Sequence, residues 1–230
     1  LFLFSLLFVT VGHAQQITFP DFSSINGLQL NGSASQASWS EQNVLRLTNG
    51  ATQSSGSIAE AGSAFFGVKQ PVAGGFTTYF QFQMHNPTTC CFSADGIAFV
   101  VHNANAADAT YGATGGGAYS LGVAGGGIGY TGIPNSLAVE FDVFGNQWDP
   151  EWANENYNAN HVAVQSCGTG TNTPVHDTLF APYSIGQNTN VPVCLVSQAA
   201  INQAIPHLAG SCGYSGCSDG SVHTVVIEYT

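Results

Sequence analysis

Short segments in which apolar and polar residues alternate constrain the fold of this chain more than any other feature. In the segment 76–84, apolar side chains would face one side of a strand, while Gln81 and Gln83 would face the other. Residues 196–205 alone have a helical pattern, with Ser197 as a candidate cap. Many short strands separated by turn residues predict an all-β fold, a single-domain antiparallel β-sandwich. The same pattern predicts further strands at 17–22, 43–47, 63–66, 96–102, 136–143, 161–166 and 222–229.

The chain has few charged side chains, and most of them are acidic. Among its 230 residues, 2 Lys and Arg stand against 13 Asp and Glu, which gives a formal net charge of -11. Such a surface cannot neutralise phosphates, so nucleic acids and anionic membranes are disfavoured as partners. Apolar and aromatic residues are abundant, so the low charge does not indicate disorder.

The first residues have the composition of a leader. Residues 1–11 are almost entirely apolar, and Gly12 and Ala14 end the run with the small side chains that a signal peptidase recognises. The run is too short to span a membrane. We therefore expect residues 1–14 to be part of a signal peptide, residues 15–230 to form the folded domain, and the protein to be secreted.

Six cysteines after such a leader indicate disulfide bonds formed in an oxidising compartment. Many pairings are compatible with six cysteines, and we expect Cys167–Cys194 and Cys212–Cys217 because each would close a loop. Cys90 and Cys91 are adjacent, and adjacent cysteines rarely bridge each other without strain.

Carboxylates gather on the predicted strand 136–143 and in the residues that follow it. Glu140 and Asp142 are two positions apart, so both side chains leave the strand on the same face. Asn146 and Asp149 follow directly. The sequence therefore places several oxygen donors within one short stretch.

This stretch needs a positive charge. Clustered, partly buried carboxylates repel one another, and the only Lys and Arg, Lys69 and Arg46, lie far away in sequence. A bound cation would remove the repulsion; the alternative is a solvated acidic loop. Asp and Asn oxygens suit Ca²⁺, and the nitrogen of His161, which opens the next apolar segment, suits a transition metal such as Mn²⁺.

The segment 140–150 reads Glu-Phe-Asp-Val-Phe-Gly-Asn-Gln-Trp-Asp-Pro and resembles the metal and sugar loop of the legume-type (L-type) lectins. This resemblance runs from about residue 20 to residue 230. It implies a concanavalin-like antiparallel β-sandwich (jelly roll) that binds carbohydrate and is not an enzyme. Residues 151–160 look like an insertion relative to the family. The resemblance also implies an Mn²⁺ or other transition-metal site made by Glu140, Asp142, Asp149 and His161, and a Ca²⁺ site made by Asp142, Asn146, Asp149 and the main-chain carbonyl of Phe144.

Two further stretches resemble the same family. Residues 94–99 are similar to a motif in which an Asp follows a cis peptide bond and accepts hydrogen bonds from sugar hydroxyls. The glycines of 125–129 are similar to a loop whose main-chain N–H contacts the sugar. A neutral sugar needs a carboxylate, an amide, a main-chain donor and an aromatic ring for its apolar face. The resemblance implies that these groups come from Asp95, Gly126, Gly127, Phe144 and Asn146.

Other interpretations stay open. Sandwich-fold glycoside hydrolases carry a Glu-x-Asp strand with a further carboxylate, but Phe144 and Gly145 stand where that carboxylate is needed. A non-catalytic carbohydrate-binding or adhesion module of a larger secreted protein would have the same chemistry. Glycans are the expected partners, and a homo-oligomer is compatible with the sequence. The chain ends in the predicted strand 222–229, where the family continues, so we expect the lectin domain to be incomplete at its C-terminus.

Overall fold

A computed structural model describes residues 16–49, 60–84, 94–105, 113–146, 148, 160–175, 183–185, 188–191 and 221–230. Regular structure in this part of the chain is β-strand, apart from two 3₁₀ turns, η2 (Gly117–Tyr119) and η3 (Gly125–Gly127). None of the described segments is a helix long and apolar enough to cross a membrane. The strands are β1 (Leu28–Gly32), β2 (Ser35–Trp39), β3 (Gln42–Arg46), β4 (Gly62–Phe66), β5 (Phe76–Gln83), β6 (Gly96–His102), β7 (Ser136–Asp142), β8 (His161–Ser166), β9 (Tyr183–Ile185), β10 (Asn188–Val191) and β11 (Val222–Tyr229).

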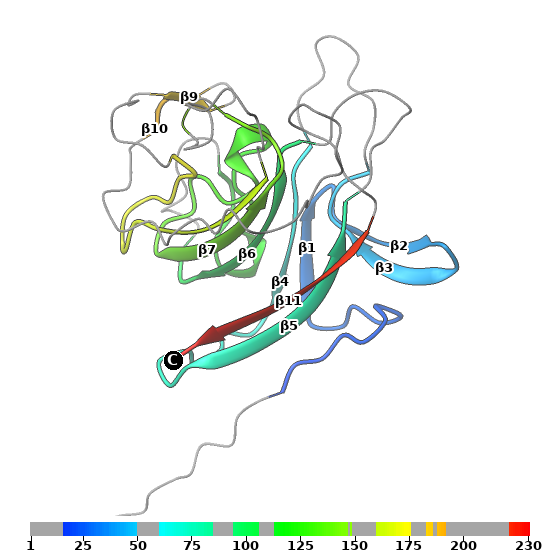
Figure 1. Ribbon diagram of the computed structural model, residues 1–230. Coiled ribbons are helices and arrows are strands. Elements are labelled where there is room, and N and C mark those ends of the chain that lie inside the picture. The colour runs from blue at the N-terminus through cyan, green and yellow to red at the C-terminus, as the bar shows by residue number, and fades with distance from the viewer. Residues whose placement is uncertain are drawn as a thin grey trace, which may run out of the picture.

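Strand β7 is the middle strand of an antiparallel sheet with the order β6–β7–β8. Strands β5 and β11 form a long antiparallel pair that begins at Phe76 opposite Tyr229, and Figure 1 shows this pair running past the β6–β7 layer. Three shorter antiparallel pairs, β1–β4, β2–β3 and β9–β10, make up the other sheets of the described residues.

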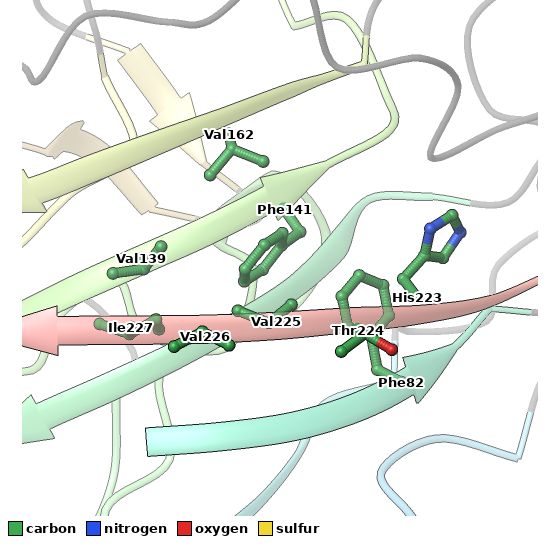
Figure 2. A pocket seen from close by; sticks show the side chains of 9 residues that line it. All are labelled: Phe82, Val139, Phe141, Val162, His223, Thr224, Val225, Val226 and Ile227. Carbon is green, nitrogen blue, oxygen red and sulfur yellow. The ribbon is translucent and has the colours of Figure 1, made fainter. Parts of the chain in front are cut away.

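The main core lies between the β6–β7–β8 sheet and the β5–β11 pair. Phe82 from β5 packs with Val139 and Phe141 from β7, and Phe82 and Phe141 have ring centroids 5.1 Å apart. An apolar pocket of about 330 Å³ lies in the same space. Figure 2 shows the side chains of its nine lining residues, which come from β5, β7, β8 and β11. No carboxylate is among them, so the pocket lacks the donors that the predicted site requires.

The opposite face of β7 is covered as well. Ile128 and Tyr130, which follow η3, pack against Ala138 of β7 and the partly buried Ala98 of β6. Strand β7 is therefore enclosed on both faces, including the face that carries its two carboxylates.

Most of the predicted strands are present within one or two residues of their predicted bounds. The strand predicted at 17–22 is wrong: no strand forms there, because Pro20 lacks an N–H for a ladder and Phe22 has a φ of 48°. Strands β1 and β2 are not among the predicted segments. Strand β2 has no clear alternation and forms by pairing with β3 through the turn at Ser40 and Glu41, both with positive φ, as in two-residue hairpins.

Several expectations lie outside the described residues. These are the signal peptide at 1–14, the helix at 196–205, and Asp149. Of the six cysteines, only Cys167 is described, so both proposed disulfide pairings stay predictions.

Candidate functional site

Glu140 and Asp142 lie on the same face of β7, and both are almost completely buried, with exposed fractions of 0% and 1%. The register of the sheet brings His161, the first residue of β8, directly opposite Asp142. His161 is also 0% exposed. The strand pattern and the register therefore bury two carboxylates and one imidazole on neighbouring strands.

The carboxylate of Glu140 has polar neighbours on both oxygens. The hydroxyl of Tyr130 donates to Oε2 at 2.6 Å. Oε1 lies 3.5 Å from Nε2 of His161 and 3.5 Å from Nε2 of Gln165. All four side chains are buried, so this is a dry polar cluster in which charge is costly unless it is balanced.

Lys and Arg do not supply that balance. The chain has only two such residues. Arg46 donates to Ser35 at 3.3 Å, and Lys69 donates to Asn103 at 2.5 Å, and both pairs are exposed. The positive charges of the chain are thus used on other surfaces.

The donor set fits a divalent cation in its chemistry. Two ligand atoms that each lie about 2.1 Å from one ion lie roughly 3–3.5 Å apart, and the 3.5 Å between Glu140 Oε1 and His161 Nε2 agrees with that spacing. Within the described ranges, no three His, Cys, Asp or Glu side chains are grouped closely enough to hold a metal by themselves. The fourth predicted ligand, Asp149, lies outside those ranges.

Asp95 stands at the start of β6, directly after a cis peptide bond between Ala94 and Asp95, as the family resemblance implies. Its main-chain carbonyl accepts from the N–H of Val143 at 2.9 Å, which ties it to the end of β7. Burial raises the pKa of Asp95 to about 6, and a side-chain hydrogen bond with Asn146 works in the opposite direction. This contact joins two of the predicted sugar-binding side chains.

The glycine turn η3 lies against the same group. A Cβ placed on Gly126 would be 3.2 Å from Nδ2 of Asn146 and 2.8 Å from Cζ2 of Trp148. Only a residue without a side chain leaves both neighbours where they are. Gly127, the next residue, donates its N–H to Ala124 within the turn at 3.4 Å.

Phe144 follows β7 and is half-buried. Its N–H donates to Oδ1 of Asp142 at 2.7 Å, which fixes the backbone of the loop that leads to Asn146. The predicted role of its carbonyl in holding Ca²⁺ stays a prediction.

Three segments that are distant in sequence thus meet at one place. Asp95, Gly126 and Asn146 are brought together, while Glu140 and His161 lie side by side in the interior and Asp142 is paired with His161 in the sheet register. Sequence reasoning missed two participants. Trp148 lies against Gly126, and its place inside the 140–150 motif was a signal that could have identified it. No sequence signal pointed to Tyr130, because a tyrosine near a glycine loop is common.

The described strands form antiparallel sheets, and the residues that follow β7 lie beside Asp95 and Gly126. The chain matches the legume lectin domain over residues 14–193, and it therefore belongs to this family of carbohydrate-binding proteins, whose members are not catalysts. The match also establishes the concanavalin-like β-sandwich predicted from the sequence. No curated protein matches the chain.

Proposed function

We propose that this protein is a lectin that binds a neutral sugar in a shallow site made by Asp95, Gly126, Gly127, Phe144 and Asn146. The observation that carries the proposal is the convergence of Asp95, Gly126 and Asn146, which come from three separate segments. Together they offer a carboxylate that accepts from sugar hydroxyls, a side-chain amide, and a glycine whose main chain a sugar can approach closely. The half-buried ring of Phe144 would take the apolar face of the sugar.

We further propose that two metal ions hold this site in its binding conformation. Ca²⁺ would be held by Asp142, Asn146, Asp149 and the carbonyl of Phe144. The second ion, Mn²⁺ or another transition metal, would be held by Glu140, Asp142, Asp149 and His161. When bound, the ions would supply positive charge to buried carboxylates, and the protein's own contribution is to fix Asn146 and Asp95 before the sugar arrives.

The remaining proposals concern context. The protein would be secreted after removal of residues 1–14, and residues 15–230 would belong to the lectin domain. Glycans would be its partners, with no role for nucleic acid or membrane insertion. Association into a homo-oligomer is also proposed. Tyr79 of β5 and Val226 of β11 face each other in register and are 64% and 57% exposed, so they are apolar surface available for association.

A glycan array with the Ca²⁺- and Mn²⁺-loaded protein tests the proposed function, with Asp95→Ala as the key variant. Asp95 can only accept hydrogen bonds when ionised, so truncation leaves sugar hydroxyls unpaired, at a cost of about 1–3 kcal/mol. On a weak monosaccharide site this loss should remove measurable binding. Gln70→Ala, in an exposed loop before β5, serves as the matched surface control. Binding by Asp95→Ala that equals this control would place the sugar site elsewhere.

A further inference from the structure

Tyr130 makes a contact that its position in the chain does not predict. Its side chain is 0% exposed, and its hydroxyl donates to Oε2 of Glu140 at 2.6 Å. Hydrogen bonds to an ionised carboxylate are shorter and stronger than neutral ones, and this one lies in a region without solvent. A buried hydroxyl without such a partner would destabilise the fold, so the Tyr130–Glu140 pair is a specific structural unit.

The backbone of Tyr130 belongs to the glycine turn. Its N–H donates to the carbonyl of Gly127 at 3.1 Å. Its ring packs with Ile128 above Ala138 of β7. One side chain therefore links the turn that carries Gly126 and Gly127 to a carboxylate on the central strand.

This link fixes how Glu140 is oriented. Because Tyr130 holds Oε2, the other oxygen, Oε1, faces Nε2 of His161 at 3.5 Å. Without the hydroxyl, the carboxylate could rotate about its last bond and exchange its two oxygens. A phenylalanine at this position would fill the same space but would remove the hydrogen bond on Oε2, which is the shortest of the contacts described for this carboxylate.

We propose that Tyr130 is a positioning residue for the transition-metal site: its hydroxyl holds Glu140 so that Oε1 and His161 Nε2 face a common point. This inference rests on the proposed function, since it assumes that Glu140 and His161 are ligands. Residues that hydrogen-bond to a metal ligand typically change metal affinity about 10–100-fold when they are replaced.

The test compares Tyr130→Phe with Tyr119→Phe. Tyr119 lies in η2, is 64% exposed and belongs to the same loop, so it controls for the loss of a phenolic hydroxyl. Isothermal titration of the metal-free proteins with Mn²⁺ should give roughly 10–100-fold weaker binding for Tyr130→Phe and unchanged binding for Tyr119→Phe. The electron paramagnetic resonance spectrum of bound Mn²⁺ should also differ between the two variants. At saturating Mn²⁺, glycan binding by Tyr130→Phe should return to the parent level.

The outcomes separate this inference from the function on which it rests. If the parent binds Mn²⁺ and both variants bind it equally, the inference is wrong and the proposed metal site stands. If the parent binds no Mn²⁺, the transition-metal part of the proposed function and the inference both fail. If Tyr130→Phe does not fold without metal, the Mn²⁺ concentration that gives half-maximal refolding replaces the titration, and a value equal to that of Tyr119→Phe overturns the inference.

Discussion

Gly126 lies so close to Trp148 and Asn146 that even one methyl group there should disturb sugar binding. In Gly126→Ala the new Cβ would lie 2.8 Å from Cζ2 of Trp148 and 3.2 Å from Nδ2 of Asn146. Carbon atoms in contact normally lie about 3.5–4.0 Å apart. The turn or the ring must therefore move by roughly 0.7–1.2 Å, and the ring of Trp148 has little room because it is only 6% exposed.

The size of the effect follows from the cost of overpacking, which is typically about 1–3 kcal/mol. The turn is the softer partner, so it should move away from Asn146 and carry its main-chain donor out of the sugar site. Restoring the binding position would then cost the same free energy. In terms of affinity, this corresponds to roughly 5–150-fold weaker glycan binding.

Calorimetric titration of the metal-saturated protein with the best glycan from an array measures this effect. Gly74→Ala is the matched control, because a Cβ on Gly74 would meet nothing within 4 Å. Shortening the ring with Trp148→Phe in the Gly126→Ala background should recover part of the affinity, since the closest clashing atom is removed. Equal affinities for Gly126→Ala and Gly74→Ala would refute the reasoning that this turn forms part of the site.

Two further predictions concern metal and pH. Chelation should lower the melting temperature by roughly 5–10 °C, because an ion at a hundred times its dissociation constant adds about 2.7 kcal/mol; an unchanged melting curve after chelation and Ca²⁺ return would argue against bound metal. Burial, and then the charge of Lys69, lower the pKa of His102 in the folded state. The folded protein thus takes up this proton less readily than the unfolded chain. The contribution of neutral His102 to folding stability is therefore fully present above pH about 6.5 and is lost as the pH falls below that value. The difference in melting temperature between the parent and His102→Gln should therefore shrink from pH 7 to pH 5, and a constant difference would contradict the assignment.

The strands that build the site were predictable because their sequences alternate. Strand β5 shows this directly, with alternate residues exposed and covered. Strand β7 shows the limit of the same argument. Its alternation suggested one polar face, yet Glu140 and Asp142 are as buried as the apolar residues between them. Periodicity reports that side chains point in opposite directions, and it does not report what later covers each face.

The contacts that join the segments were not predictable from the residues alone. Tyr130 reaches Glu140 only because the backbone after the glycine turn folds back over the sheet. Trp148 meets Gly126 only because the chain after β7 passes beside that turn. Both contacts depend on where a loop passes another part of the chain, and loop paths are set by the packing of the whole domain. The resemblance to a family supplied the candidate site residues, and the structure supplied the contacts between several of them.

Strand β7 and the residues directly after it connect the groups of the proposed site. Asp95 is held at its end through Val143, Gly127 is linked to its middle through Tyr130, and Asn146 lies on the loop that leaves it. A change in the charge balance of Glu140 would therefore act on the glycine turn through Tyr130, and one at Asp142 would act on the loop that leads to Asn146 through Phe144. A chain with only two Lys and Arg residues buries these two carboxylates against polar partners: Tyr130, Gln165 and His161 lie beside Glu140, and the N–H of Phe144 donates to Asp142. In the proposed function a bound ion would add positive charge at these carboxylates, and this would couple the metal to the shape of the sugar site.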